Sequence, residues 1–238
     1  MPSVKSIVPV FLILALSPWA SRADANAIFA TGDFVLGGAS DGTSFVVGDL
    51  GGDDTVNNWP TAEGPEHMID GVGQKYLNFA GDETGMAAGA LVTPGSGSSI
   101  ARSITFWTAN DQVERDPASF ALYGTNDAIS AASPGDSILL STFDLIASSN
   151  ITLPATRNVG GMFPLLPENS VTVAFANLNA YTSYLVLFPT LKNADSANSM
   201  QIAEVQLESA VVPEPGTLFL LGSGLIGILA AVRRRSRR

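Results

Sequence analysis

Short runs of β-prone residues, each ended by Gly, Asn, Asp or Pro, constrain the fold of this chain more than any other feature. Between residues 27 and 208 these breakers return about every eight to twelve positions, and no stretch keeps a helical period. This pattern predicts an all-β fold. The expected strands are Ala27–Leu36, Ser44–Val47, Lys75–Ala80, Met86–Thr93, Ile100–Thr108, Ser119–Gly124, Ile138–Ile146, Ser170–Asn177, Thr182–Pro189 and Met200–Glu208.

Several of these runs alternate between apolar and polar residues. Ile104 and Phe106 fall on one face of their run, and Thr105 and Trp107 fall on the other, which is typical of a strand with one buried side. The run Thr182–Pro189 is apolar on both faces and is expected to be buried on both. Because no helices are predicted to cover a sheet, we expect two antiparallel sheets packed face to face, a β-sandwich of the jelly-roll kind.

The first residues have the features of a secretory signal peptide. Lys5 precedes the apolar run Ile7–Leu16, and small residues follow it as far as Ala25. We therefore expect residues 1–25 to direct the chain to the Sec translocon and to be removed by signal peptidase. Cleavage is predicted after Ala25, with a cut after Ala27 as the alternative.

The last residues form a three-part segment. Pro213, Glu214 and Pro215 come first, and residues 217–232 follow without a charge. Sixteen residues make a helix of roughly 24 Å, which spans a bilayer with local thinning. The chain then ends in a basic cluster, which should hold residues 233–238 on the cytoplasmic side. The cluster consists of Arg233, Arg234, Arg235, Arg237 and Arg238.

This order of parts resembles the PEP-CTERM protein-sorting tail of Gram-negative bacteria, which spans residues 213–238 here. The resemblance implies that an exosortase-type membrane protease recognises and cleaves the tail. The chain would then be anchored transiently in the inner membrane before it reaches the cell surface or the extracellular matrix. A permanent membrane anchor is the alternative interpretation.

The predicted exported domain, residues 26–212, is strongly acidic. It contains five basic and twenty acidic side chains, which gives a formal charge of −15. Such a surface repels phosphate backbones and anionic headgroups, so nucleic acid is excluded as an expected partner, whereas cations and neutral sugars remain compatible. The chain has no cysteine, which excludes thiol catalysis and cysteine-ligated metal centres.

A second resemblance covers residues 59–207. Five segments appear in an order similar to that of discoidin-like, galactose-binding-like domains: Ile69–Gly71, Lys75–Phe79, Ser103–Phe106, Ser119–Gly124 and Met200–Leu207. The resemblance implies an eight-stranded sandwich with binding loops at one end. It also implies a structural calcium ion held partly by Asp70 and Glu204. The alternative for Glu204 is a surface carboxylate on an edge strand.

The last expected strand contains an irregularity of its own. Met200 and Ile202 fall on one face of the run, but Val205 and Leu207 fall on the other. A bulge or a change of buried face near Ala203 would place all four side chains in the core.

Four loop residues are candidate ligand-binding groups. Trp107 is suited to stacking on a sugar, and Trp59 is suited either to such stacking or to capping the end of the sandwich. His67 is the only histidine, and no nucleophile elbow accompanies it, so we expect it to order its loop rather than to act in catalysis. Arg115 either presents its guanidinium to a ligand or braces its turn.

Two acidic pairs complete the candidates. Asp111 and Asp116 are the carboxylates with which a bracing Arg115 would pair. Asp53 and Asp54 lie in a glycine-rich loop, where they form either part of a calcium site or a solvated turn. The solvated turn is the preferred interpretation.

Taken together, these features predict an exported, non-enzymatic β-sandwich that binds extracellular polysaccharide or serves as a matrix component. A secreted carbohydrate-active hydrolase is one alternative, because the acidic residues of the domain offer many carboxylate pairs. A purely structural surface protein is the other.

Overall fold

The computed structural model describes residues 26–50, 57–80, 85–130 and 132–209. These residues lie within one compact unit, Ala25–Val211. The predicted signal peptide, the tail from Pro213 to Arg238, and the Asp53–Asp54 pair lie outside the described residues. Within the described ranges, the structure contains no helix with the length and apolar character that crossing a bilayer requires.

The described chain consists of strands and four short 3₁₀ helices. The strands are β1 (Phe34–Ser40), β2 (Ser44–Val47), β3 (Asp49–Leu50), β4 (Asn58–Trp59), β5 (Tyr76–Asn78), β6 (Ala87–Thr93), β7 (Ala101–Trp107), β8 (Ser119–Thr125), β9 (Ser137–Leu139), β10 (Asp144–Asn150), β11 (Ser170–Ala174), β12 (Ser183–Phe188), β13 (Met200–Ile202) and β14 (Glu204–Ser209). The helices are η1 (Pro65–Ile69), η2 (Val113–Arg115), η3 (Leu140–Thr142) and η4 (Pro167–Asn169).

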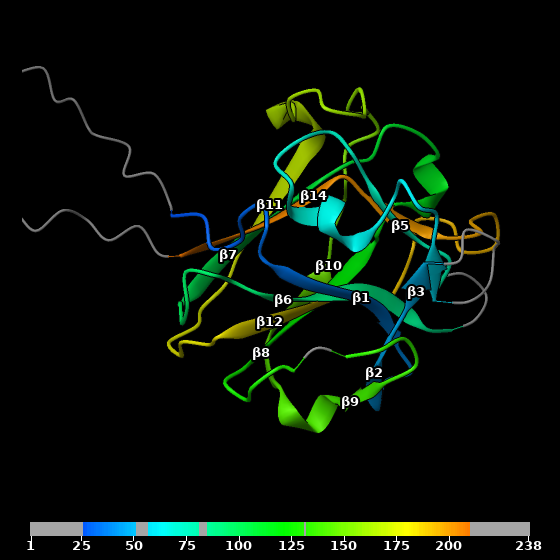
Figure 1. Ribbon diagram of the computed structural model, residues 1–238. Helices are drawn as coiled ribbons and strands as arrows, with labels where there is room; N and C mark the ends of the chain where they lie inside the picture. The colour runs from blue at the N-terminus through cyan, green and yellow to red at the C-terminus, as the bar shows by residue number, and fades with distance from the viewer. Residues whose placement is uncertain (1–25, 51–56, 81–84, 131, 210–238) are drawn as a thin grey trace, which may run out of the picture. The chain divides into compact units, whose positions relative to one another are not determined.

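Two antiparallel sheets form the body of this unit (Figure 1). The larger has the strand order β10-β8-β12-β6-β1-β2-β9, and the smaller has the order β11-β7-β14. Two short pairs, antiparallel β13-β5 and parallel β3-β4, lie outside both sheets. The predicted antiparallel sandwich is therefore confirmed.

The central strands β12 and β6 of the larger sheet are buried on both faces. On the inner face, Phe106 of the smaller sheet packs against Phe120 and Phe188 with ring centroids 5.1 and 6.0 Å apart. On the outer face, a second apolar cluster forms around Phe45 and Leu185, and the segment 126–143 packs against it. This arrangement explains why every residue of β12 is buried, as the sequence predicts.

Two of the expected strands are wrong in extent. The run Ala27–Leu36 makes only an isolated bridge at Ala27 before β1 starts at Phe34. The run Ile138–Ile146 is two strands, because β9 pairs with β2 at one edge of the larger sheet and β10 pairs with β8 at the other. The chain must cross between these edges, and η3 begins that crossing.

The predicted irregularity at Ala203 is confirmed. Residues Met200–Ile202 pair with β5, whereas Glu204–Ser209 pair with β7. Ala203 lies between the two pairings and donates its N–H to the carbonyl of Trp107 at 3.1 Å. The apolar side chains before and after it are fully buried, although they alternate out of phase along the sequence.

The described chain begins and ends at the same end of the sandwich. Ala27 bridges Glu208, and the N–H of Ser209 donates to the carbonyl of Asn26 at 2.9 Å. At the opposite end, three long connections emerge: residues 108–118, 151–169 and 189–199. We call this the loop end.

Candidate functional site

A buried lysine fixes the connection after β7. Lys75 donates to both carboxylate oxygens of Asp111 at 2.9 and 3.0 Å, and its Nζ lies 3.5 Å from a carboxylate oxygen of Glu63. The fully buried amide of Gln201 donates to the backbone carbonyls of Asp111 and Gln112 at 2.7 and 2.9 Å. The residues 111–112 are therefore held against β5 and β13.

A second tie joins all three long connections of the loop end. The carboxylate of Asp116, which is fully buried, accepts two bonds from Arg157 at 2.8 and 2.5 Å and one from Lys192 at 2.8 Å. Lys192 also donates to the carbonyl of Leu153 at 2.9 Å. This buried carboxylate fixes the relative positions of these segments, because both cations depend on it for their anionic partner.

These two ties overturn the pairing expected for Arg115. Asp111 is bound by Lys75, and Asp116 is bound by Arg157 and Lys192. The guanidinium of Arg115, which is half-buried in η2, makes no hydrogen bond or ion pair with the described residues. Arg115 is therefore a cation at the loop end without a carboxylate partner in the described part of the chain.

His67 and Asp70 belong to one hydrogen-bond network at the end of η1. Nδ1 of His67 lies 2.9 Å from Oδ2 of Asp70, and the amide of Gln74 donates to the same oxygen at 2.8 Å. Oδ1 of Asp70 accepts the N–H of Val72 at 3.0 Å. The ordering role predicted for His67 agrees with these contacts.

Glu204 lies against this network. The N–H of Gly71 donates to its Oε2 at 3.0 Å, and the side chain is almost fully buried. Desolvation, with a smaller contribution from the charge of Asp70, raises the pKa of Glu204 to about 8. A carboxylate in this position needs a proton or a cation to be stable.

Asp70 and Glu204 fit a cation in part. They offer two carboxylates on either side of Gly71, which are hard oxygen ligands of the kind that calcium binds. However, the described residues contain no group of three or more acidic or histidine side chains able to hold a metal ion. Any calcium here would therefore take its remaining ligands from backbone carbonyls and water.

The two tryptophans proposed as ligand groups are more covered than expected. Trp59 packs against the main core and meets Tyr76 edge-on, with ring centroids 6.0 Å apart. Trp107 is half-buried at the end of β7, where it is paired in register with Ser170 and Glu204. Among the described contacts, neither Trp59 nor Arg115 joins the His67–Asp70 network.

The segment 158–166, which we call the apolar loop, was not singled out from the sequence. Its base is Asn158, whose buried amide donates to the carbonyl of Thr108 at 2.7 Å and accepts the N–H of Leu166 at 3.0 Å. Three large apolar side chains between these two residues are exposed: Val159, Met162 and Phe163. The Gly160–Gly161 pair in this loop was the available signal, because consecutive glycines mark a tight turn.

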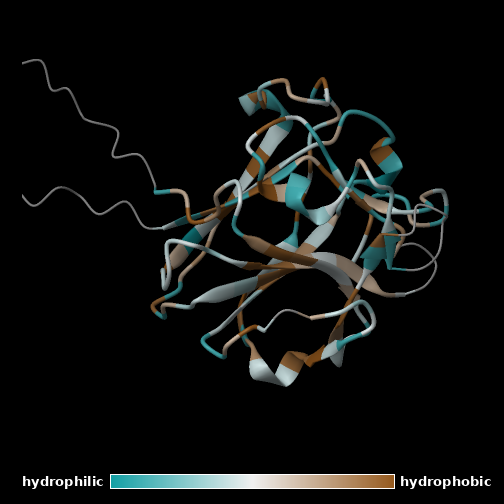
Figure 2. Ribbon diagram, in the orientation of Figure 1, coloured by the Kyte–Doolittle hydropathy of each residue, from teal (hydrophilic) through white to brown (hydrophobic). Residues whose placement is uncertain are grey.

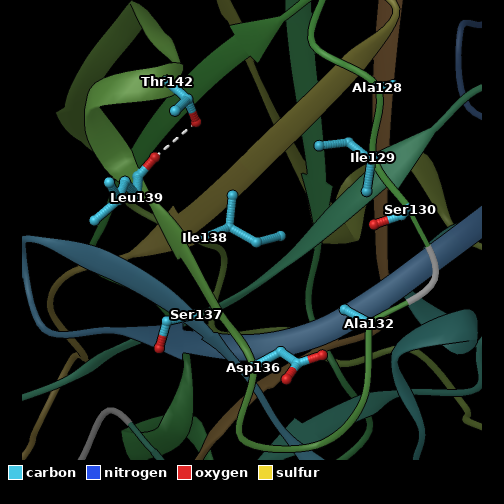
Figure 3. A pocket seen from close by; sticks show the side chains of 9 residues that line it. All are labelled: Ala128, Ile129, Ser130, Ala132, Asp136, Ser137, Ile138, Leu139 and Thr142. Carbon is cyan, nitrogen blue, oxygen red and sulfur yellow. Dashed lines mark hydrogen bonds between the residues drawn. The ribbon is translucent and has the colours of Figure 1, made fainter.

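A pocket of about 490 Å³ lies away from the loop end, between residues 128–132 and β9 (Figure 3). The side chains of Ile129 and Ile138 point into it. Its one charged lining residue, Asp136, accepts the N–H of Ser133 at 2.7 Å, so this carboxylate already has a partner within its own turn. None of the residues proposed from the sequence lines this pocket.

Comparison with known protein families finds a match at the C-terminal end of the chain. Residues 211–235 match the PEP-CTERM protein-sorting motif, so the resemblance of the tail is confirmed. This motif implies that the chain is an exported surface protein with a sorting tail. No curated protein matches the chain.

The solved structures that resemble the chain include three carbohydrate-binding modules. One is the family 32 module of NanJ from Clostridium perfringens, in complex with galactose, with 11% identity, 76% of this chain and 96% of that chain covered, and a TM-score of 0.45. A second is the family 32 module of EndoD from Streptococcus pneumoniae, with 11% identity, 78% and 100% covered, and a TM-score of 0.45. A third is chitosan-binding module 1 of a chitosanase/glucanase from Paenibacillus sp. IK-5, with 9% identity, 77% and 99% covered, and a TM-score of 0.43. At these values the likeness assigns no ligand to this chain.

Proposed function

We propose that the chain is a non-catalytic surface module that binds neutral polysaccharide through its loop end. In this proposal, residues 217–232 anchor the exported protein in the inner membrane until an exosortase-type protease cleaves at the Pro213–Pro215 region. The domain then remains at the cell surface or in the exopolysaccharide matrix. The sorting motif supports export, and the charge of −15 over residues 26–212 favours a neutral partner over an anionic one.

The observation that carries the proposal is the locked geometry of the loop end. Buried ties at Lys75 and Asp116 hold its connections in place, so a ligand would meet a surface that is already ordered. Preorganisation of this kind lowers the entropic cost of binding. Arg115 has no carboxylate partner among the described residues, and in this proposal its guanidinium donates to a sugar hydroxyl.

We also propose that Asp70 and Glu204 hold a structural calcium ion. The ion would neutralise the two neighbouring carboxylates and so stabilise the turn at Gly71 against the first residue of β14. It has no part in catalysis in this proposal.

Affinity electrophoresis of the purified exported protein tests the binding function. Gels that contain a neutral galactan, glucan or xylan should retard the wild-type protein. Arg115→Gln should weaken that binding about tenfold, which corresponds to a loss of ~1.4 kcal/mol of binding free energy. Trp107→Ala tests whether the half-buried indole contributes. Asp127→Asn, which changes an exposed carboxylate, is the matched control. A folded wild-type protein that no neutral polysaccharide retards would refute the function, and turnover of a chromogenic glycoside would favour the hydrolase.

A further inference from the structure

The apolar loop exposes three large hydrophobic side chains to solvent. Met162 is 75% exposed, Val159 is 63% exposed and Phe163 is 58% exposed, all within five residues. In Figure 2 the ribbon of the connection that leads into β11 includes brown, hydrophobic positions. Isolated exposed apolar side chains are ordinary, but three on one short loop mark an interaction surface.

The loop is held in shape rather than loosely exposed. Gly73 donates its N–H to the carbonyl of Phe163 at 2.8 Å, and Val72 bridges Pro164. Gly160 and Gly161 both have positive φ angles, 83° and 60°, which side chains other than glycine rarely adopt. A Cβ on Gly160 would lie 3.0 Å from the amide nitrogen of Asn110, so the neighbouring connection packs directly on the loop.

Phe163 is also the aromatic side chain best placed for a ligand. Among the described residues, the exposed large aromatics are Phe163 and Phe34, and Phe34 lies at the start of β1, near the chain ends. The two tryptophans are partly covered by their own neighbours. An exposed ring on an ordered loop suits the apolar face of a sugar.

The negative charge of the domain favours some binding partners of the apolar loop over others. A formal charge of −15 over residues 26–212 opposes a second copy of the chain and an anionic bilayer alike. A neutral glycan has no such repulsion, and the exposed amide of Asn110 beside Gly160 supplies polar contacts for its hydroxyls.

We propose that Phe163, flanked by Met162 and Val159, is the platform on which a neutral glycan chain stacks at the loop end. This inference rests on the proposed polysaccharide binding and names the residues that carry it. The platform lies at the end of the sandwich opposite Ala27 and Ser209.

Three variants of the exported protein test the platform in the same galactan, glucan and xylan gels. Phe163→Ala should reduce retardation about tenfold, and Phe163→Trp should restore or strengthen it, because a larger ring keeps the stacking surface. Phe34→Ala removes the other exposed ring, which is 41% exposed, and should leave retardation unchanged. Melting temperatures within about 2 °C of wild type would show that the exposed substitutions leave the fold intact.

The outcomes separate this inference from the function on which it rests. If no neutral polysaccharide retards the wild type, both proposals fail. If the wild type is retarded and Phe163→Ala is retarded equally, the platform is wrong and the binding function stands. If the wild type binds phosphatidylcholine vesicles through Phe163 and Phe163→Ala is retarded as the wild type is, the loop binds lipid and the platform is overturned. If Phe163→Ala instead changes between monomer and dimer with no change in retardation, the loop contacts a second copy and the platform is likewise overturned.

Discussion

The backbone N–H of Gly71 donates to Oε2 of Glu204 at 3.0 Å, across 133 residues of sequence. This bond joins the turn after η1 to the first residue of β14. Glu204 is buried beside Asp70 at this point, and desolvation, with a smaller contribution from the charge of Asp70, raises the pKa of Glu204 to about 8. The turn therefore depends on the protonation or ion binding of one side chain.

Stability should fall as the pH rises through the range between the two pKa values of Glu204. The unfolded chain loses this proton near pH 4.5, whereas the folded protein keeps it to about pH 8. The contribution of the Glu204 proton to folding stability is thus complete below pH 4.5. It declines between these two values by at most ~1.4 kcal/mol per pH unit, and it does not change further above about pH 8. Urea unfolding in chelator should show this decline in wild type and not in Glu204→Gln. Equal pH profiles for the two proteins would contradict the assignment.

Chelator should lower the melting temperature if Asp70 and Glu204 hold calcium. At a calcium concentration 100-fold above the dissociation constant, binding adds ~2.7 kcal/mol, or roughly 5–10 °C for a domain of this size. Asp70→Ala should melt at one temperature with and without calcium, whereas Asp127→Ala should behave as wild type. Identical wild-type melting curves in calcium and in chelator would remove the site.

Asp116→Asn should destabilise the protein by about 3–5 kcal/mol, because it leaves Arg157 and Lys192 without their shared carboxylate. Equilibrium urea unfolding measures the loss. Asp127→Asn changes an exposed carboxylate and should stay within about 0.5 kcal/mol of wild type. A loss below 1 kcal/mol for Asp116→Asn would mean that this tie does not hold the loop end together.

The mature protein should lack the tail if an exosortase-type protease processes it. Intact-mass measurement of the extracellular fraction should then give a C-terminus upstream of Thr217, and Glu214→Ala should shift the protein to the membrane fraction with Arg238 retained. Wild-type protein found only in the membrane with Arg238 present would instead indicate the permanent anchor.

The β-sandwich could be predicted from the sequence because the patterns that indicate its strands lie within short stretches of the chain. Alternation along Ile100–Thr108 and the double burial of β12 follow from the period of a strand. The break at Ala203 was also predictable, since the apolar residues of this run switch from one face before Ala203 to the other face after it. The division of Ile138–Ile146 was not, because the pairing of β9 and β10 with opposite sheet edges is a property of topology.

The candidate site shows the same limit more clearly. Arg115 lies beside two acids in sequence, yet Lys75 and Arg157 bind those acids from 36 and 41 residues away. Competition among distant cations for one carboxylate is decided by three-dimensional packing, which residue spacing does not encode. The exposure of Phe163 depends likewise on a base formed by Asn158 with Thr108 and Leu166.

The adjacent chain ends determine how the domain would respond to mechanical force. Tension applied through the tail enters at Ser209, the last residue of β14, which is an edge strand of the smaller sheet. The hydrogen bonds between β14 and β7 would then be loaded one pair at a time, beginning at Ser209 and Ala101. Such peeling would reach Glu204 last among the residues of β14, so its bond to the turn at Gly71 would be the last contact of this strand to break.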